Sequence, residues 1–334
     1  MLTVVTVPPS PTDTALPPTL TFEPTTQSTP TLPPVVSFMA VGDIMLARSI
    51  GDKILTQGPQ VVFADVADVL NTADVLVGNL ECSIASVGQP EPKAYTFAAP
   101  PEAASALGTV GFDVLGLANN HALDYGPEAL FETQQLLSAQ GITGVGAGAD
   151  EGAAHAPVVI EKNGLRIAFL AYVEVPVESG GFDTRVWIAG PDKPGVAWID
   201  PARIQSEVAE ARTQADVVVV LLHFGWEGRT TVYPEQKAAA HAAIDGGAAL
   251  VIGSHPHVLQ MSEWRNGGFI AYSLGNFVFD GFGFPENYTA ILSATLTPAG
   301  VTDVQWIPVV IENSLPRPAT PNESAIILRM VGGG

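Results

Sequence analysis

Apolar runs alternate with amphipathic segments along most of the chain after residue 35. Seven of the apolar runs have strand length, at 35–43, 73–81, 112–121, 165–174, 215–227, 248–257 and 268–280. Helical periodicity fills four of the connections, at 49–68 with a break at 58–59, and at 127–139, 201–214 and 234–245. Strands that are apolar along their whole length are covered on both faces, so this alternation predicts an α/β fold.

Both ends of the chain lack this pattern. Residues 1–34 are rich in Pro, Thr and Ser and contain no core pattern, which predicts a disordered tether. Such a segment is typical of a stalk between a membrane anchor and an exported domain, and a cytoplasmic disordered tail is the alternative. Residues 289–312 predict antiparallel edge strands, and residues 313–334 predict a loosely attached tail. The folded domain is therefore expected to span residues 35–312.

Composition and charge limit the partners of this domain. The chain carries 34 acidic residues against 14 Lys and Arg, a net charge of −20, which argues against nucleic acid as a partner. No apolar stretch is long enough for a transmembrane helix, and residues 1–9 are too short for a signal peptide. From the stalk-like composition we expect an extracytoplasmic domain, attached to a membrane only through a leader or anchor upstream of this sequence.

Side chains suited to metal ligation stand at the ends of the predicted strands. They are Asp43, Glu81, Asn120, His121, His223, His255 and His257. One histidine at a strand end is more often structural, but four of the six histidines share this position with carboxylate and amide groups. In open α/β sheets that edge binds ligands. These donors suit Zn²⁺, Mn²⁺ or Fe, and Cys82, as the single cysteine, cannot form a Cys-cluster site, which favours a hydrolytic centre.

Six motifs in order and spacing resemble those of a known family. They are GDIMLAR (42–48), GNLECSI (78–84), GLANNHALDYG (116–126), LHFGWE (222–227), IGSHPHVLQ (252–260) and YSLGNFVFD (272–280). The chain thereby resembles the bacterial capsule-synthesis CapA family of the poly-γ-glutamate type, which is similar to the calcineurin-like metallophosphoesterases. The resemblance covers about residues 36–312. It implies a four-layer αββα sandwich of two mixed sheets with one or two divalent metal ions at the strand ends.

The resemblance also implies roles for individual residues. The places of the family's metal ligands are taken by Asp43, Asn120, His223, His255 and His257. His121 matches the acid that protonates the leaving group. Three positions depart from the superfamily pattern. Met45 replaces a histidine, Asn79 replaces the bridging aspartate, for which Glu81 is the natural substitute, and Ala122 replaces an acidic residue, for which Asp124 is the candidate.

Four further residues are assigned to the site. We assign Asn79, Glu227 and Asn276 to substrate binding. Glu227, four residues after His223, either orients a ligand or water or is a solvated carboxylate at the rim. Arg48 follows the Asp43 turn, and it either clamps an anion during catalysis or forms a surface salt bridge.

Two functions fit these residues. One is a metal-dependent hydrolase or transferase of capsule, poly-γ-glutamate or cell-envelope polymer metabolism, in which His121 protonates the leaving group. The other is a non-catalytic accessory protein that binds an anionic envelope polymer or its synthase, and the departures at positions 45 and 79 favour it. Because a chain of charge −20 repels polyglutamate at long range, binding of that polymer needs a local positive site, formed by the metal ions and Arg48.

Overall fold

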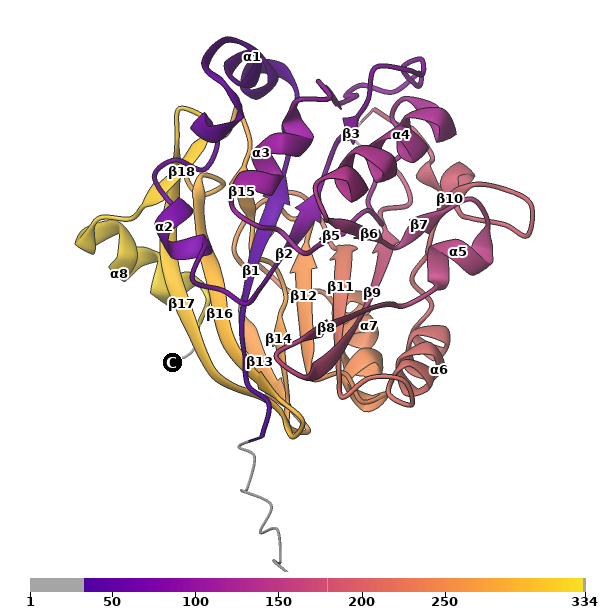
Figure 1. Cartoon of the computed structure of the whole chain (residues 1–334), viewed down its shortest axis with the longest axis vertical. Coiled ribbons are helices and arrows are strands. Elements are labelled where there is room, and N and C mark those ends of the chain that lie inside the picture. The colour runs from indigo at the N-terminus through magenta and orange to yellow at the C-terminus, as the bar shows by residue number, and fades with distance from the viewer. Residues whose placement is uncertain (1–32, 179, 333–334) are drawn as a thin grey trace, which may run out of the picture. The chain divides into compact units, whose positions relative to one another are not determined.

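Two mixed β-sheets contain most of the apolar runs (Figure 1). The computed structural model describes residues 33–178 and 180–332, so residues 1–32 of the predicted tether lie outside the described residues. The first sheet has the strand order β18-β17-β16-β1-β2-β5-β6, with β15 also paired to β1. Its strands are β1 (Val36–Ile44), β2 (Val75–Leu80), β5 (Val114–Gly116), β6 (Thr143–Val145), β15 (Asn276–Val278), β16 (Tyr288–Thr297), β17 (Gly300–Glu312) and β18 (Leu315–Pro318).

The second sheet has the order β13-β14-β12-β11-β9-β8. Its strands are β8 (Val158–Lys162), β9 (Leu165–Glu174), β11 (Val217–Phe224), β12 (Leu250–Ser254), β13 (Ser262–Arg265) and β14 (Gly268–Ala271). Two small sheets pair β3 (Ser83–Ile84) with β4 (Ala98–Ala99) and β7 (Ala147–Gly148) with β10 (Gly195–Val196).

Helices occupy most of the longer connections between strands. They are α1 (Arg48–Gln57), η1 (Pro59–Val61), α2 (Ala67–Leu70), α3 (Ala103–Thr109), α4 (Gly126–Ala139), α5 (Glu151–His155), η2 (Thr184–Trp187), α6 (Pro201–Ala211), α7 (Pro234–Asp245) and α8 (Pro321–Met330). Within the described residues, none of these helices is both long and apolar enough to cross a membrane.

Strand β11 shows how the layers are built. Side chains alternate between the two faces of a strand. Val219 and Leu221 belong to a core that includes residues of both sheets, whereas Val218 and Val220 belong to the core that the second sheet shares with α6 and α7. Figure 1 shows α2 and α3 beside strands β1 and β2 of the first sheet. The predicted four-layer αββα sandwich of two mixed sheets is therefore confirmed.

The single strand predicted over 268–280 is wrong. The segment forms two strands in different sheets, with β14 beside β12 and β15 beside β1. The chain crosses between the sheets at Gly275, which has a φ of 65°. A side chain at Gly42 would lie 1.9 Å from the Gly275 carbonyl oxygen, so glycine at position 42 permits this crossing. The crossing passes beside Asp43, whose backbone N–H donates to the same carbonyl at 2.9 Å.

The C-terminal segment also differs from the prediction of a loose tail over 313–334. Its strand β18 pairs with β17. Ile327 of helix α8 and Val331, the residue after that helix, are buried in one cluster with Ala290 and Val310. A tail of this length can pack because β16 and β17 offer an apolar face. As predicted, β16 and β17 are antiparallel, but β18 is the edge strand.

Candidate metal centre

All seven side chains that the strand-end pattern selected lie together in the structure. The first sheet supplies Asp43 at the end of β1 and Glu81 directly after β2, and the turn after β5 supplies Asn120 and His121. The second sheet supplies His223 in β11, and His255 and His257 follow β12. None of the seven residues is more than 6% exposed. The carboxyl ends of strands from both sheets therefore build one buried polar site.

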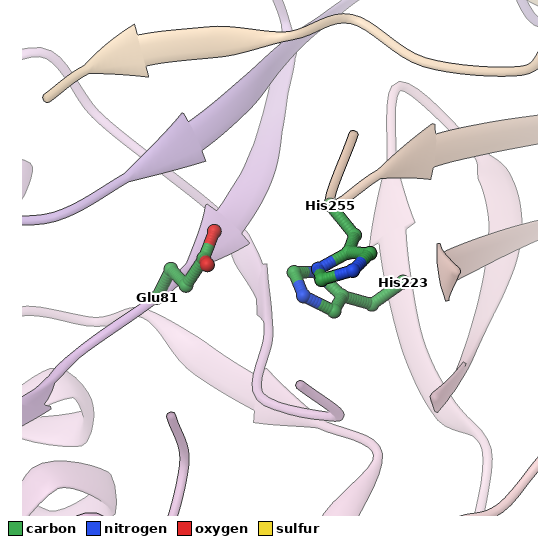
Figure 2. Close-up of side chains that lie close together, drawn as sticks. All are labelled: Glu81, His223 and His255. Carbon is green, nitrogen blue, oxygen red and sulfur yellow. The ribbon is translucent and has the colours of Figure 1, made fainter. Parts of the chain in front are cut away.

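Two groups of these side chains have the spacing of metal ligands. Glu81 forms one group with His223 and His255, and a second group with Asp43 and His257. Within each group one ligand atom of every residue lies within 4.8 Å of the others. Figure 2 shows the Glu81 carboxylate to one side of the His223 and His255 rings. Glu81 is thus the residue that the two groups share.

Unsatisfied atoms in this site fit a divalent metal. Both carboxylate oxygens of Glu81 and Nδ1 of His255 are buried and have no hydrogen-bond partner among the described residues. A buried carboxylate without a partner is costly, and a cation removes that cost. The donor set of imidazole nitrogens and carboxylate oxygens suits Zn²⁺, Mn²⁺ or Fe.

The backbone at the second-sheet ligands is strained. His255 and His257 have φ values of 93° and 58°, in the region that favours glycine. A non-glycine residue there costs about 1–3 kcal/mol and persists where its surroundings hold it in place. The His255 N–H donates to Asp43 Oδ2 at 3.1 Å, which fixes one of the two residues against the first sheet.

Asn79 was predicted to bind substrate, and the structure gives it another place. Its amide Nδ2 donates to Asp43 Oδ1 at 2.8 Å and lies 3.1 Å from His223 Nδ1. Its Oδ1 accepts from Asn119 Nδ2 at 3.1 Å. At 7% exposed, this side chain orients the candidate ligands around it.

Asn276 was also predicted to bind substrate, and its side chain is fully buried. Its Oδ1 lies 2.8 Å from His257 Nδ1, and its Nδ2 donates to the backbone carbonyls of His257 and Glu286. Both ends of the amide are thus bonded to protein. Asn276 fixes the orientation of the His257 ring, and its predicted contact with substrate stays a prediction.

His121 and Asp124 form a hydrogen-bonded pair. His121 Nδ1 lies 2.7 Å from Asp124 Oδ2, which also accepts the backbone N–H of Phe97 at 2.7 Å. His121 Nε2 lies 3.9 Å from Glu81 Oε1, so this nitrogen is beside the shared carboxylate. This geometry fits the roles that the family resemblance implied for His121 and Asp124.

Lys93 and Glu178 support this site, and the sequence did not indicate their pairing. Lys93 Nζ is buried and donates to Asp124 Oδ1, Glu178 Oε1 and the Asn120 carbonyl at 2.6–2.7 Å. Glu178 Oε1 also accepts from Asn120 Nδ2 at 2.8 Å, and Asn120 Oδ1 lies 2.7 Å from His223 Nε2. Glu178 follows the end of β9 by four residues, so its place after a strand was the available signal.

Burial and charge shift the pKa values of the candidate ligands in opposite directions. Burial, with the nearby Asp43 charge, raises the pKa of Glu81 well above its usual value. Burial, with neighbouring imidazoles, holds the pKa values of His223 and His255 well below theirs. Burial also opposes protonation of His257, but the hydrogen bond and charge of Asp43 outweigh it and raise that pKa. The lowered pKa values favour the neutral form of His223 and His255, which is the form of imidazole that binds a metal ion.

Two cavities adjoin the site. One, of about 490 Å³, is lined in part by Glu178, Arg229 and His255, and the other, of about 280 Å³, in part by His121 and His257. Glu227 lines both and is exposed, as a rim carboxylate would be. Arg48 lines the smaller cavity and forms an ion pair with Asp280, which is the salt-bridge alternative considered for this residue.

Comparison with known proteins relates this arrangement to a family. A family model described as bacterial capsule synthesis protein PGA_cap matches residues 37–281. The capsule biosynthesis protein CapA of Bacillus anthracis is 32% identical over 288 residues, which cover 84% of this chain and 68% of that protein. The PGA biosynthesis protein CapA of Bacillus subtilis is 33% identical, with coverage of 85% and 74%. A probable polyglutamine synthesis accessory protein of Mycobacterium tuberculosis is 32% identical, with coverage of 66% and 60%.

Solved structures give the fold independently. A structure described as a novel phosphatase from Mycoplasma pneumoniae superposes with a TM-score of 0.54 at 12% identity, covering 88% of this chain and 98% of that one. A hypothetical protein from Thermus thermophilus gives a TM-score of 0.50 at 18% identity, with coverage of 81% and 98%. At these identities the likeness extends to the metallophosphoesterase-like fold alone.

Proposed function

Since the chain belongs to the bacterial capsule synthesis family PGA_cap, we propose that it is a metal-dependent hydrolase or transferase of envelope polymers. The polymers in question are capsule or poly-γ-glutamate, or the precursors from which they are made. Names of the relatives in Bacillus refer to capsule and PGA biosynthesis, which supports this choice of pathway. We further propose that the domain acts outside the cytoplasm, beside the synthase components of that pathway.

The observation that carries the proposal is the position of Glu81. Its two buried carboxylate oxygens have no hydrogen-bond partner among the described residues, and Glu81 belongs to both groups of candidate ligands. His121 Nε2 lies 3.9 Å from its Oε1. A site built only for stability would not leave a carboxylate without a partner in its core. Metal-assisted hydrolysis requires side chains that can hold the metal ion and, beside them, a group that can donate a proton. The candidate ligands and the His121–Asp124 pair meet these two requirements.

Roles for the chain's own residues follow from this geometry. A divalent cation held by Asp43, Glu81 and the three ligand histidines would stabilise negative charge that develops at the reacting centre. Asp124 fixes the His121 ring through Nδ1, which leaves Nε2 to give a proton to the leaving group.

A non-catalytic accessory protein is the second candidate. Met45 and Asn79 stand where the superfamily pattern has a histidine and a bridging aspartate, and a mycobacterial relative is named as an accessory protein. In this case the same site would bind an anionic polymer or a synthase component without turnover.

Metal analysis and turnover separate the two candidates. Purified protein is assayed for bound metal, then for hydrolysis of phosphoesters and γ-glutamyl amides with and without Mn²⁺. We expect stoichiometric metal and metal-dependent turnover. His255→Ala should lose metal, whereas the matched variant His121→Ala should keep it and lose about 10²–10⁴-fold in turnover, the range for a general acid. Metal-free protein without turnover would refute the hydrolase and favour the accessory role. Loss of metal from His121→Ala would contradict the assignment of His121 as the acid.

A further inference from the structure

The smaller cavity beside His121 has aromatic walls. Four side chains supply them: Tyr95, Phe97, Phe279 and Phe282. The Phe97 ring stacks on the His121 ring with centroids 4.2 Å apart. The rings of Phe279 and Phe282 lie 5.1 and 5.2 Å from that of His257. The cavity of about 280 Å³ thus adjoins both the proposed acid and a candidate ligand, and its size suits a single ring.

The Arg48 and Asp280 charges beside this cavity are paired within the protein. Arg48 is the one Lys or Arg among its described lining residues, and its guanidinium is paired with Asp280. The same guanidinium lies 4.7 Å from the centre of the Phe97 ring, so it makes both an ion pair and a cation–π contact within the protein. The Glu227 carboxylate adds a further negative charge at the rim. The cavity therefore offers apolar ring faces, and its one guanidinium is already paired within the protein.

The larger cavity, which also adjoins the candidate ligands, has a different character. Its lining includes Arg229 and Tyr233 together with the candidate ligand His255. No ion pair of the Arg229 side chain is found in the part of the chain that the structure describes, so that guanidinium can attract an anionic group. Of the two carboxylates that also line this cavity, Glu178 is paired with Lys93, and Glu227 is shared with the smaller cavity. The candidate metal ligands therefore adjoin both an aromatic cavity and one with a cationic side chain.

A general acid must lie within hydrogen-bond reach of the atom that leaves. Because His121 lines only the aromatic cavity of the two, we propose that this cavity is the leaving-group subsite and that it takes an uncharged ring with an apolar face, a sugar or an aryl ring. The inference rests on the proposed function. For a phosphoester, water adds to phosphorus, and the bond from phosphorus to the ester oxygen carried by the ring breaks with its electron pair on that oxygen. His121 protonates the oxygen and is reprotonated from the attacking water, which gives phosphate and the ring alcohol.

The test compares ring and non-ring leaving groups on the full chain with Mn²⁺. Phenyl phosphate and glucose 1-phosphate carry rings, and ethyl phosphate does not. Phe282→Ala should raise KM for a ring substrate about tenfold, the effect of losing one aromatic contact, and should affect ethyl phosphate much less. Phe284→Ala is the matched control, because Phe284 is 67% exposed, packs on Tyr288 and does not line the cavity. Which of the two ring substrates responds identifies the kind of ring.

Binding of the uncharged products keeps the subsite testable without turnover. Phenol and glucose are titrated into the wild type and both variants by NMR. If the rings bind, Phe282→Ala weakens that binding and the protein hydrolyses no substrate, the subsite is upheld and the hydrolase function is refuted. Turnover without preference for rings, or equal effects of Phe282→Ala and Phe284→Ala, would overturn the subsite and leave the hydrolase standing. If neither product binds and no substrate is turned over, both proposals are refuted.

Discussion

Lys93 connects the two functional parts of the site at the scale of single residues. Its ammonium bonds Asp124, which holds the His121 ring, and Glu178, which holds the Asn120 amide. The ammonium also lies 4.8 Å from the centre of the Trp187 ring. One buried cation therefore positions both the proposed acid and a candidate metal ligand.

Removing this cation should be strongly destabilising. Lys93→Met leaves two buried carboxylates without their counter-charge, so we expect a loss of about 3–5 kcal/mol in the free energy of unfolding, measured by urea denaturation. Adding Glu178→Gln should recover part of that loss, because the two changes act on one contact. The control is Arg185→Met, which breaks an exposed pair with Asp183 and should cost far less stability. Equal stability of Lys93→Met and wild type would refute this role.

The sequence predicted the candidate metal ligands but not the residues that hold them in place. The reason lies in where these residues stand in the fold. Asp43, Glu81 and the histidines follow apolar strands, and strand ends converge in an α/β fold. Lys93 and Glu178 lie in irregular loops 85 residues apart, where no periodicity links them. Asn79 and Asn276 could be placed near the site, but which way their amides point depends on bonds that appear only in the folded chain.

At the scale of elements, long strands and helices were predictable and crossings were not. Strand β9 and helices α4 and α7 follow the predicted ranges closely, because apolar period and terminal prolines mark them. The apolar run 268–280 belongs to two sheets, and nothing in its hydrophobicity marks the change. Helix α8 follows a proline-rich segment that looked like a tail, although Thr320 and Glu323 have the spacing of a capping box.

That capping box supplies a test of whether α8 belongs to the folded unit. Thr320 accepts the Glu323 N–H, and Glu323 in turn bonds the Thr320 N–H at 2.7 Å. Thr320→Ala should lower the free energy of unfolding by about 1 kcal/mol, whereas Thr320→Ser keeps the hydroxyl and should cost far less. Urea denaturation measures both. Equal midpoints for the two variants would show that the cap does not contribute to stability.

Acid should weaken the same helix end. Hydrogen bonds from Arg317 and from the Thr320 backbone lower the pKa of Glu323 to about 2, below its value in an unfolded chain. The stability from this carboxylate is present above the unfolded value near pH 4.5 and is lost as pH falls toward 2. Glu323→Gln should therefore reduce the dependence of the urea midpoint on pH over that window. The same pH dependence in Glu323→Gln and wild type would contradict this assignment.

For the whole molecule, the site is a junction between its two sheets. Asp43 and Glu81 come from the first sheet and the three ligand histidines from the second, so a metal ion bound by both sets would join them. A ligand that binds only the folded chain stabilises it by mass action. Metal binding should therefore raise the melting temperature of the entire domain, and a chelator should lower it.

The size of that stabilisation should depend on pH in a defined direction. Metal binding needs a carboxylate at Glu81 and a neutral ring at His257, and both groups have raised pKa values, so binding must displace their protons. Without metal, the stability that these two groups gain from holding protons is present at low pH and is lost as pH rises through their folded pKa values. The difference in melting temperature between Mn²⁺-loaded and chelator-treated protein should therefore grow from pH 6 to pH 8.

Calorimetry of Mn²⁺ binding at pH 6 measures the proton release directly, from the dependence of the observed heat on the ionisation enthalpy of the buffer. We expect net release in the wild type and a smaller release in Glu81→Gln. His223 and His255 have lowered pKa values and are already neutral, so they add nothing to it. His241→Ala is the control, since His241 pairs with Glu263 and Tyr272 away from the ligands and should leave the release unchanged. Metal binding without proton release would show that Glu81 and His257 are not ligands.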